Sequence, residues 1–418
     1  MYNERYFLKH EQHFFDQFEF ENGFIMENVK VDYGVFGTPK YDDEGNIINA
    51  ILFCHNFEGN YSRISDFNSW TEKNKVFDKD EYYFISITSL GFPESCSPST
   101  SGLNHNFPNY QIEDLVKFQR RLIREKFPNI KKLKGIIGYS VGGYIALGWS
   151  IYYPDDMDFI ILLNSSFKSQ GHRYVFANLA NRIIEQSSQY SLDLYDESIS
   201  RLLISISQIH YILSFSKDYL NNLSILDIDL SIERFAEDIL FIDIYDIKFC
   251  NDFILSYNLE DDLDKIKCNV CIIAGDSTNY YVAKYDSIPI HEAVEGSTYL
   301  PLDIDDDLNI LNHIYKVEPN LKEFIDSIVG YALFIQLGGA FDIVGDDDGP
   351  VTVPHMLTVF HFTFFRMSDH VYSLTFFVWP CSPQTAALYP PDADSCRIPP
   401  AGCRAAVQNH PSFLIIIS

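Results

Sequence analysis

A serine in this chain lies between an expected strand and an expected helix. Apolar residues 135–137 predict a short buried strand, the sequence Gly138-Tyr-Ser-Val-Gly142 follows, and residues 143–153 have helical character. In this context the pattern G-x-S-x-G is typical of a sharp turn that exposes a nucleophilic serine hydroxyl. Glycines flank Ser140 because side chains there would collide with the turn and with the neighbouring strand. We therefore predict that Ser140 is a nucleophile, and a coincidental turn is the alternative.

Composition and charge narrow the class of protein and of partner. The chain has 418 residues, of which 46% are hydrophobic and 21% are charged, as in a globular protein of two or three units. Its net charge of −27 argues against nucleic acid and anionic membranes as partners. No apolar segment is typical of a secretory signal, and none approaches the roughly 20 residues of a membrane span. We expect a cytoplasmic protein without nucleic acid or membrane as a partner, and the charge itself does not identify a substrate.

The 8 cysteines are scattered along the chain. Without a secretory signal, this distribution favours reduced thiols over a disulfide framework. Cys268 and Cys271 form a C-x-x-C pair, but they run into an apolar strand-like segment and no second pair follows at zinc spacing. We interpret both as buried structural residues, with a metal or redox role as the alternative, and we predict no metal and no bound cofactor.

Alternation of strand-like and helix-like segments predicts the core. Residues 17–37 predict an antiparallel pair, with strands at 18–24 and 29–36. Buried strands at 50–54, 82–87 and 159–163 are then expected on either side of a helix at 111–126 and of the Ser140 turn. Such alternation implies a mostly parallel sheet with helices on both faces, in an α/β fold.

Changes in pattern divide the chain further. Residues 1–166 form the first part of the core, and residues 167–262 lose strand signals in favour of helical patterns, which indicates an inserted helical lid. Residues 263–328 return to strands and end in a closing helix at 321–328. Residues 329–418 contain no lysine but 9 of the 18 prolines. A separate module, a disordered tail and a frameshift are the three interpretations of this atypical extension.

The chain resembles homoserine O-acetyltransferases and their α/β-hydrolase relatives over about residues 17–328. Residues 91–102 resemble the Gly/Ser/Pro-rich loop of that family, and residues 107–116 resemble its FP-containing segment, with Gln111 in place of a threonine. The other matching segments, in family order and spacing, are 29–37, 50–60, the Ser140 turn and 146–155. The resemblance implies the α/β-hydrolase fold with a helical lid.

The resemblance also implies a Ser–His–Asp triad that passes an acyl group from acyl-CoA to an amino-acid hydroxyl. Ser140 matches the nucleophile, which needs a histidine base and a carboxylate that orients the histidine. Residues 55–59 match the family's oxyanion loop. By that match the backbone N–H groups of Phe57 and Val141 would hold the oxyanion, and His55 would be structural.

The match is incomplete at the acid. Family spacing places the acid at Asn279, in the loop 275–281, where a neutral amide could orient an imidazole without stabilising its cation. Asp276, three residues earlier, is the alternative, and a site with no functional acid is the third hypothesis, in which Asp276 caps a turn.

For the base, His313 follows the last expected strand, at the position of the family's Gly-His, with Asn312 in place of the glycine. His291 is the competitor, but it lies in an expected surface helix, so we favour His313. Arg182 resembles a lid arginine that meets an amino-acid carboxylate in that family, a task that suits a bidentate guanidinium. An exposed helix arginine is the alternative.

We therefore expect an O-acyltransferase of the homoserine O-acetyltransferase type that works through an acyl-Ser140 intermediate, with acyl-CoA as cosubstrate. A hydrolase of esters or thioesters on the same fold is the alternative, and a catalytically inactive binding protein is the second alternative. The formation of a homodimer is a further expectation.

Overall fold

The computed structural model describes residues 8–57, 59–192, 197–240, 242–276, 278–304 and 310–338, together with four short strands further along the chain. The chain divides into two compact units, Met1–Ala340 and Phe341–Ser418. In the described part of the chain, no helix is long and apolar enough to cross a membrane.

The described strands of the first unit form one sheet in the order β1-β2-β4-β3-β5-β6-β7-β8. Strands β1 and β2 pair antiparallel, β2 is antiparallel to β4, and the remaining neighbours are parallel. The expected α/β fold with a mostly parallel sheet is thereby confirmed. The strands are β1 (Lys9–Glu19), β2 (Ile25–Gly37), β3 (Ala50–Cys54), β4 (Tyr83–Ile87), β5 (Leu133–Tyr139), β6 (Met157–Leu163), β7 (Asn269–Gly275) and β8 (Thr298–Leu302).

The first strand begins earlier than the sequence analysis expects. Residues 20–24 form the turn of the β1–β2 hairpin, in which the N–H of Gly23 donates to the carbonyl oxygen of Phe20 at 2.8 Å. Phe15 and Phe18 on β1 are buried. The aromatic residues at 20 and 24 therefore flank a turn, although their β propensity favours a strand.

Both faces of the sheet are buried. In β3, Leu52 and Cys54 join one core cluster, while Ile51 and Phe53 join the other, because successive side chains of a strand point to opposite faces. Helices α2 (Ile112–Lys126) and α3 (Val141–Tyr152) contribute to the first cluster. Helices α1 (Asn68–Thr71) and α12 (Glu318–Gly338) contribute to the second. This arrangement brings the C-terminal ends of the parallel strands to one edge of the sheet.

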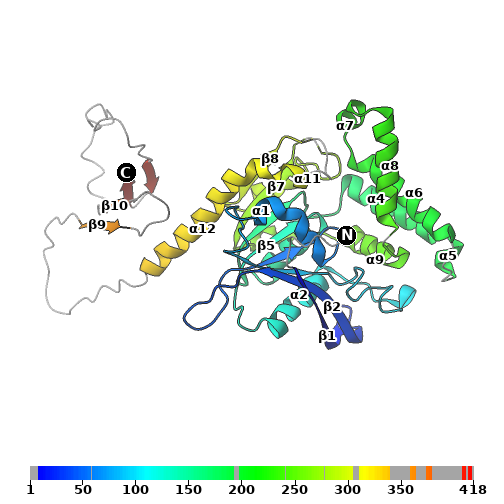
Figure 1. Ribbon diagram of the computed structural model, residues 1–418, viewed down its shortest axis with the longest axis horizontal. Helices are drawn as coiled ribbons and strands as arrows, with labels where there is room; N and C mark the ends of the chain where they lie inside the picture. Colours follow the sequence, from blue (N-terminus) through cyan, green and yellow to red (C-terminus); the bar gives the residue numbers. More distant parts are fainter. Residues whose placement is uncertain are drawn as a thin grey trace. The chain divides into compact units, whose positions relative to one another are not determined.

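Between β6 and β7 the described elements are helices, in agreement with the helical pattern expected for the lid segment. Helices α4, α6 and α9 share a third apolar cluster, and Figure 1 shows α6, α7 and α8 (green) extending away from the sheet. Ile212, Ile225 and Leu226 are exposed on this extension. The lid helices are α4 (Gly171–Glu185), α5 (Ser188–Ser191), α6 (Glu197–Ser214), α7 (Lys217–Asn222), α8 (Ile225–Ile239) and α9 (Ile244–Ser256).

The closing helix is longer than expected. It was predicted at 321–328, with a boundary at 329, but α12 continues to Gly338 and the first compact unit ends at Ala340. In the second unit, β9 (Thr358–Thr363) pairs antiparallel with β10 (Ser373–Val378), and β11 (Val407–His410) pairs with β12 (Phe413–Ile416). The other residues of the extension lie outside the described part, so its three interpretations stay untested.

Candidate active site

Ser140 lies on a strained turn between β5 and α3. Its backbone angles are φ 56° and ψ −118°, a conformation that residues with a side chain rarely adopt. Its N–H donates to the carbonyl oxygen of Leu163 on β6 at 3.0 Å, which fixes the turn to the neighbouring strand. The serine therefore stands at the C-terminal edge of the sheet, at the N-terminus of α3, where exposed N–H groups favour negative charge.

The flanking glycines are required by backbone packing. A Cβ atom on Gly138 would overlap the carbonyl oxygen of Gly142, and one on Gly142 would overlap the carbonyl oxygen of Cys54 at the end of β3. These obstacles are main-chain atoms, which cannot rotate away. The collisions expected from the sequence are thus present in the structure.

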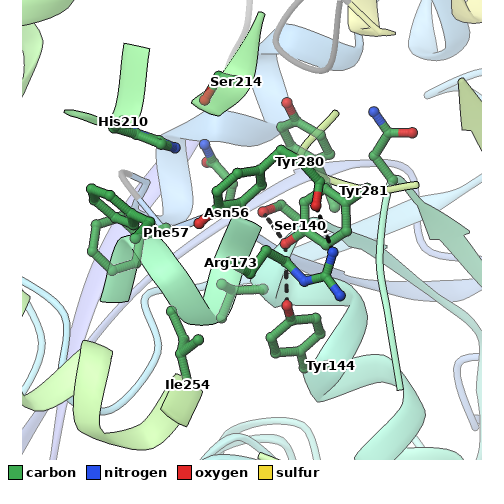
Figure 2. Close-up of a pocket in the computed structure, with 14 residues that line it drawn as sticks. Asn56, Phe57, Ser140, Tyr144, Arg173, His210, Ser214, Ile254, Tyr280 and Tyr281 are labelled. Carbon is green, nitrogen blue, oxygen red and sulfur yellow. Dashed lines mark hydrogen bonds between the residues drawn. The ribbon is translucent and has the colours of Figure 1, made fainter. Parts of the chain in front are cut away.

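Ser140 opens into a cavity of about 40 Å³, enough for a few water molecules (Figure 2). The loop after β3, the Ser140 turn, the lid and the loop after β7 each contribute part of its wall. No carboxylate is among the lining residues, which are Asn56, Phe57, Tyr139, Ser140, Val141, Tyr144, Asn164, Arg173, Phe176, His210, Ser214, Ile254, Tyr280 and Tyr281. Six of these fourteen residues are Phe or Tyr, whose bulky rings limit the free space beside the serine.

The hydroxyl of Ser140 is hydrogen-bonded to a tyrosine. Oγ of Ser140 lies 2.9 Å from Oη of Tyr281, and Oη of Tyr144 lies 3.4 Å beyond it. The dashed lines in Figure 2 mark this chain of hydroxyls. Burial raises the pKa of Tyr281 well above its usual value, so its phenol is neutral.

A buried ion pair lies against this tyrosine. The Arg173 guanidinium lies 4.7 Å from the centre of the Tyr281 ring. Its Nη1 donates to Oδ2 of Asp286 at 2.9 Å, and both side chains are 2% exposed. Ser166 also donates its hydroxyl proton to Asp286, at 2.8 Å. These contacts connect α4 of the lid with the loop that carries Tyr281.

Sequence reasoning gave no role to Arg173 or Tyr281. Tyr281 stands in the loop predicted to hold the acid, and Arg173 stands within the expected helical lid, residues 167–262. The sequence shows Arg173 as a positively charged residue within a helical pattern. It does not identify Asp286, 113 residues away, as the partner of that charge.

The structure does not bring the predicted acids to the cavity. Asp276 is exposed at the end of β7, and its N–H donates to the carbonyl oxygen of Leu302 at 2.9 Å. The Nδ2 group of Asn279 donates to the carbonyl oxygen of Phe215 in the lid at 2.7 Å. Neither lines the cavity, because the loop turns Tyr280 and Tyr281 inward instead.

His313, the predicted base, ends α11 (Ile310–His313) and is half-buried. It does not line the cavity, and its buried Nδ1 has no hydrogen-bond partner among the described residues. His291 is exposed on α10 (Ser287–Ala293), with Nδ1 2.8 Å from Oγ of Ser297. The histidine that does line the cavity is His210 on α6, which stacks on Phe176 with ring centres 4.5 Å apart.

His55 has the bonding expected of a structural residue. Its Nδ1 donates to the carbonyl oxygen of Asn56 at 2.8 Å, and its Nε2 accepts from the N–H of Ser89 at 3.0 Å. Burial lowers its pKa to about 4, so the ring is neutral. Phe57 and Val141 line the cavity beside Ser140, although their role as oxyanion donors stays a prediction.

Arg182 lies outside the cavity. It is exposed on α4, where its Nε donates to Oδ1 of Asn178 at 2.7 Å. The predicted role of Arg182 in binding a carboxylate is therefore not supported by its position. The arginine at the cavity is Arg173, nine residues nearer the start of the chain and on the inward face of the same helix.

Comparisons with known proteins extend these observations. A family model described as the alpha/beta hydrolase fold matches residues 49–300. A probable acyltransferase from Methanothermobacter thermautotrophicus is 30% identical over 310 residues, which cover 74% of this chain and 95% of that protein. A homoserine O-acetyltransferase from Haemophilus influenzae is also 30% identical, over 46% of this chain and 56% of the enzyme, a little over half its length.

Solved structures share the fold at lower identity. An acetylester hydrolase from Corynebacterium glutamicum superposes with a TM-score of 0.67 and 20% identity, over 76% of this chain and 96% of that one. A homoserine O-acetyltransferase from Bacillus anthracis superposes with a TM-score of 0.65 and 19% identity, over 76% and 97%. Transferases and hydrolases are thus both among the proteins that resemble this chain.

Proposed function

The chain belongs to the α/β-hydrolase fold family, and on that premise we propose that it is a serine O-acyltransferase of the homoserine O-acetyltransferase type. The observation that carries the proposal is Ser140 on its strained turn, at the N-terminus of α3 and open to a cavity under a helical lid. A serine in this position can accept an acyl group and then pass it to a second substrate. We propose acyl-CoA as the donor and an amino-acid hydroxyl as the acceptor.

The proposed reaction has two halves. Oγ of Ser140 attacks the acyl carbon, the thiolate leaves, and the acceptor hydroxyl then attacks the acyl-serine. We assign the N–H groups of Phe57 and Val141 to the oxyanion, since both residues line the cavity beside the serine. We assign the base to His313, since it follows β8 and its Nδ1 is unbonded within the described residues.

Transfer is favoured over hydrolysis by the character of the cavity. Its free volume is about 40 Å³ and six of its fourteen lining residues are Phe or Tyr, which leaves little room for water beside Ser140. Exclusion of water protects an acyl-enzyme from hydrolysis. The alternative is an ester hydrolase, favoured by the structural likeness to an acetylester hydrolase. We further propose that the protein acts in the cytoplasm on small molecules without a bound metal or cofactor.

Two assays test the proposal in sequence. A fluorophosphonate probe should label the wild-type protein and leave Ser140→Ala unlabelled. Acetyl-CoA with L-homoserine should then release free CoA and form O-acetylhomoserine, detected by mass spectrometry, while acetyl-CoA alone should release CoA much more slowly. Equal CoA release with and without the acceptor would support the hydrolase. Absence of labelling and of acyl transfer would support the catalytically inactive alternative.

A further inference from the structure

We propose that Ser214, on the lid, is a substrate-binding residue whose hydroxyl accepts a hydrogen bond from an ammonium group on the acceptor alcohol. This inference rests on the proposed acyl transfer through Ser140. It narrows the class of acceptor to short alcohols that carry an amino group close to the reacting hydroxyl. It gives Ser214 a part in specificity and leaves the chemistry at Ser140 unchanged.

The hydroxyl of Ser214 is an unpaired polar group in the wall of the cavity. Ser214 is 1% exposed, and its Oγ has no hydrogen-bond partner among the described residues. It lines the same cavity as Ser140, and Figure 2 shows it on the lid side. A buried hydroxyl without a partner is unfavourable for folding, so its position at a cavity points to a partner that a ligand supplies.

The surroundings of Ser214 favour a positively charged partner. Ser214 is the last residue of α6, and the last turn of a helix carries carbonyl groups without intrahelical donors, which give this end a partial negative charge. The aromatic residues that line the cavity add ring faces, which attract cations. The lid side of the cavity therefore suits an ammonium group better than a carboxylate.

The arginine that lines the cavity does not oppose this assignment. Arg173 lies against Tyr281, and Asp286 balances its charge through the 2.9 Å bond described above. An ammonium group in the cavity therefore meets no unbalanced guanidinium. For the same reason Arg173 is a poor anchor for a carboxylate of the substrate, since a carboxylate of the protein already occupies it.

The size of the cavity limits the distance between the two polar ends of the acceptor. Its free volume is about 40 Å³, so a hydroxyl beside Ser140 and an ammonium group beside Ser214 belong to one short molecule. L-Homoserine is such a molecule. 3-Amino-1-propanol has the same spacing between oxygen and nitrogen but no carboxylate, and 4-hydroxybutanoate keeps the carboxylate but lacks the amino group.

The test compares Ser214→Ala with Ser207→Ala. Ser207 lies on the same helix, is also 1% exposed and also has an Oγ without a partner among the described residues, but it does not line the cavity. Both variants thus remove an unpaired buried hydroxyl, and one of them removes it from the cavity wall. Transfer from acetyl-CoA is measured with L-homoserine, 3-amino-1-propanol and 4-hydroxybutanoate.

In Ser214→Ala we expect kcat/KM for both amino acceptors to fall by about 10- to 100-fold, the usual effect of losing a hydrogen bond to a charged group. The value for 4-hydroxybutanoate should stay close to that of the wild type, as should the acetylation of Ser140 by acetyl-CoA in mass spectra. Ser207→Ala should match the wild type throughout. Ser214→Cys, which replaces the hydroxyl by a weak hydrogen-bonding group of similar size, should behave as Ser214→Ala and serves if that variant folds poorly.

An equal loss for all three acceptors would indicate a structural role, and a loss confined to 4-hydroxybutanoate would assign Ser214 to a carboxylate. Either result would contradict the inference, as would the absence of any change. Acetyl-Ser140 that forms but passes its acetyl group to neither amino acceptor would contradict the inference alone. A wild-type protein that forms no acetyl-Ser140 would instead overturn the proposed function.

Discussion

Two walls of the cavity around Ser140 are held in place by different forces. On the wall formed by β5 and α3, backbone atoms pack so closely that Gly138 and Gly142 admit no side chain. On the wall formed by the loop after β7, Tyr281 is positioned by side chains, above all by the ion pair of Arg173 with Asp286. The first wall fixes the position and backbone conformation of Ser140. The second wall fixes the charged groups and the hydrogen-bonding hydroxyl near its side chain. Amino-acid substitutions in the two walls should therefore impair the protein in different ways.

Ser140→Ala should have the largest effect. Because the members of a catalytic group act as a unit, we expect turnover to fall by about 10⁴- to 10⁶-fold. The melting temperature should stay close to that of the wild type, since the turn is built from glycines and main-chain bonds. Steady-state acyl transfer and circular dichroism measure the two quantities, with the exposed Ser101→Ala as the matched control. Turnover similar to the wild type would exclude Ser140 as the nucleophile.

His313→Gln should have the next largest effect on activity. If His313 accepts the proton of Ser140, we expect acylation to slow by about 10²- to 10⁴-fold. His210→Gln tests the histidine that lines the cavity, and His291→Gln is the surface control. A large loss in His210→Gln with none in His313→Gln would move the base from the loop after β8 to the lid.

Arg173→Met tests how the second wall is held. Removing one partner of a buried ion pair leaves an unpaired charge, so we expect the free energy of unfolding to fall by about 3–5 kcal/mol. The double variant Arg173→Met/Asp286→Leu removes both charges and should recover a large part of that loss. Urea unfolding of both variants measures the difference. A single variant as stable as the wild type would show that the ion pair does not hold the loop.

Asp276→Asn should have the smallest effect. The carboxylate is exposed and outside the cavity, so we expect kcat/KM within about 2-fold of wild type, as for most exposed substitutions. Asn279→Asp loses the hydrogen bond to Phe215 and should destabilise the protein by about 1 kcal/mol. A large loss of activity in Asp276→Asn would restore it as the triad acid.

The same contrast explains what the sequence could predict. The Ser140 turn is specified within a few residues by glycine spacing, and the sheet is specified by alternation of apolar segments, so both were predictable. Tyr281 contacts Ser140 across 141 positions in the chain, and Arg173 contacts Asp286 across 113. Contacts between residues so far apart leave no periodic pattern in the local sequence. Family spacing located the loop after β7, but the direction of each side chain depends on contacts that form in three dimensions.

The lid also consists of two parts, and this division has an evolutionary consequence. Helix α4 is joined to the core by the Arg173–Asp286 pair, whereas α6 supplies His210 and Ser214 to the cavity from the part that extends outward. Substitutions of His210 or Ser214 would therefore change the wall of the cavity, while the serine, its tyrosine partner and the buried ion pair stay unchanged. Sequence variation at these two buried positions would thus reshape the cavity without touching the nucleophile, provided that the new side chains keep a similar volume.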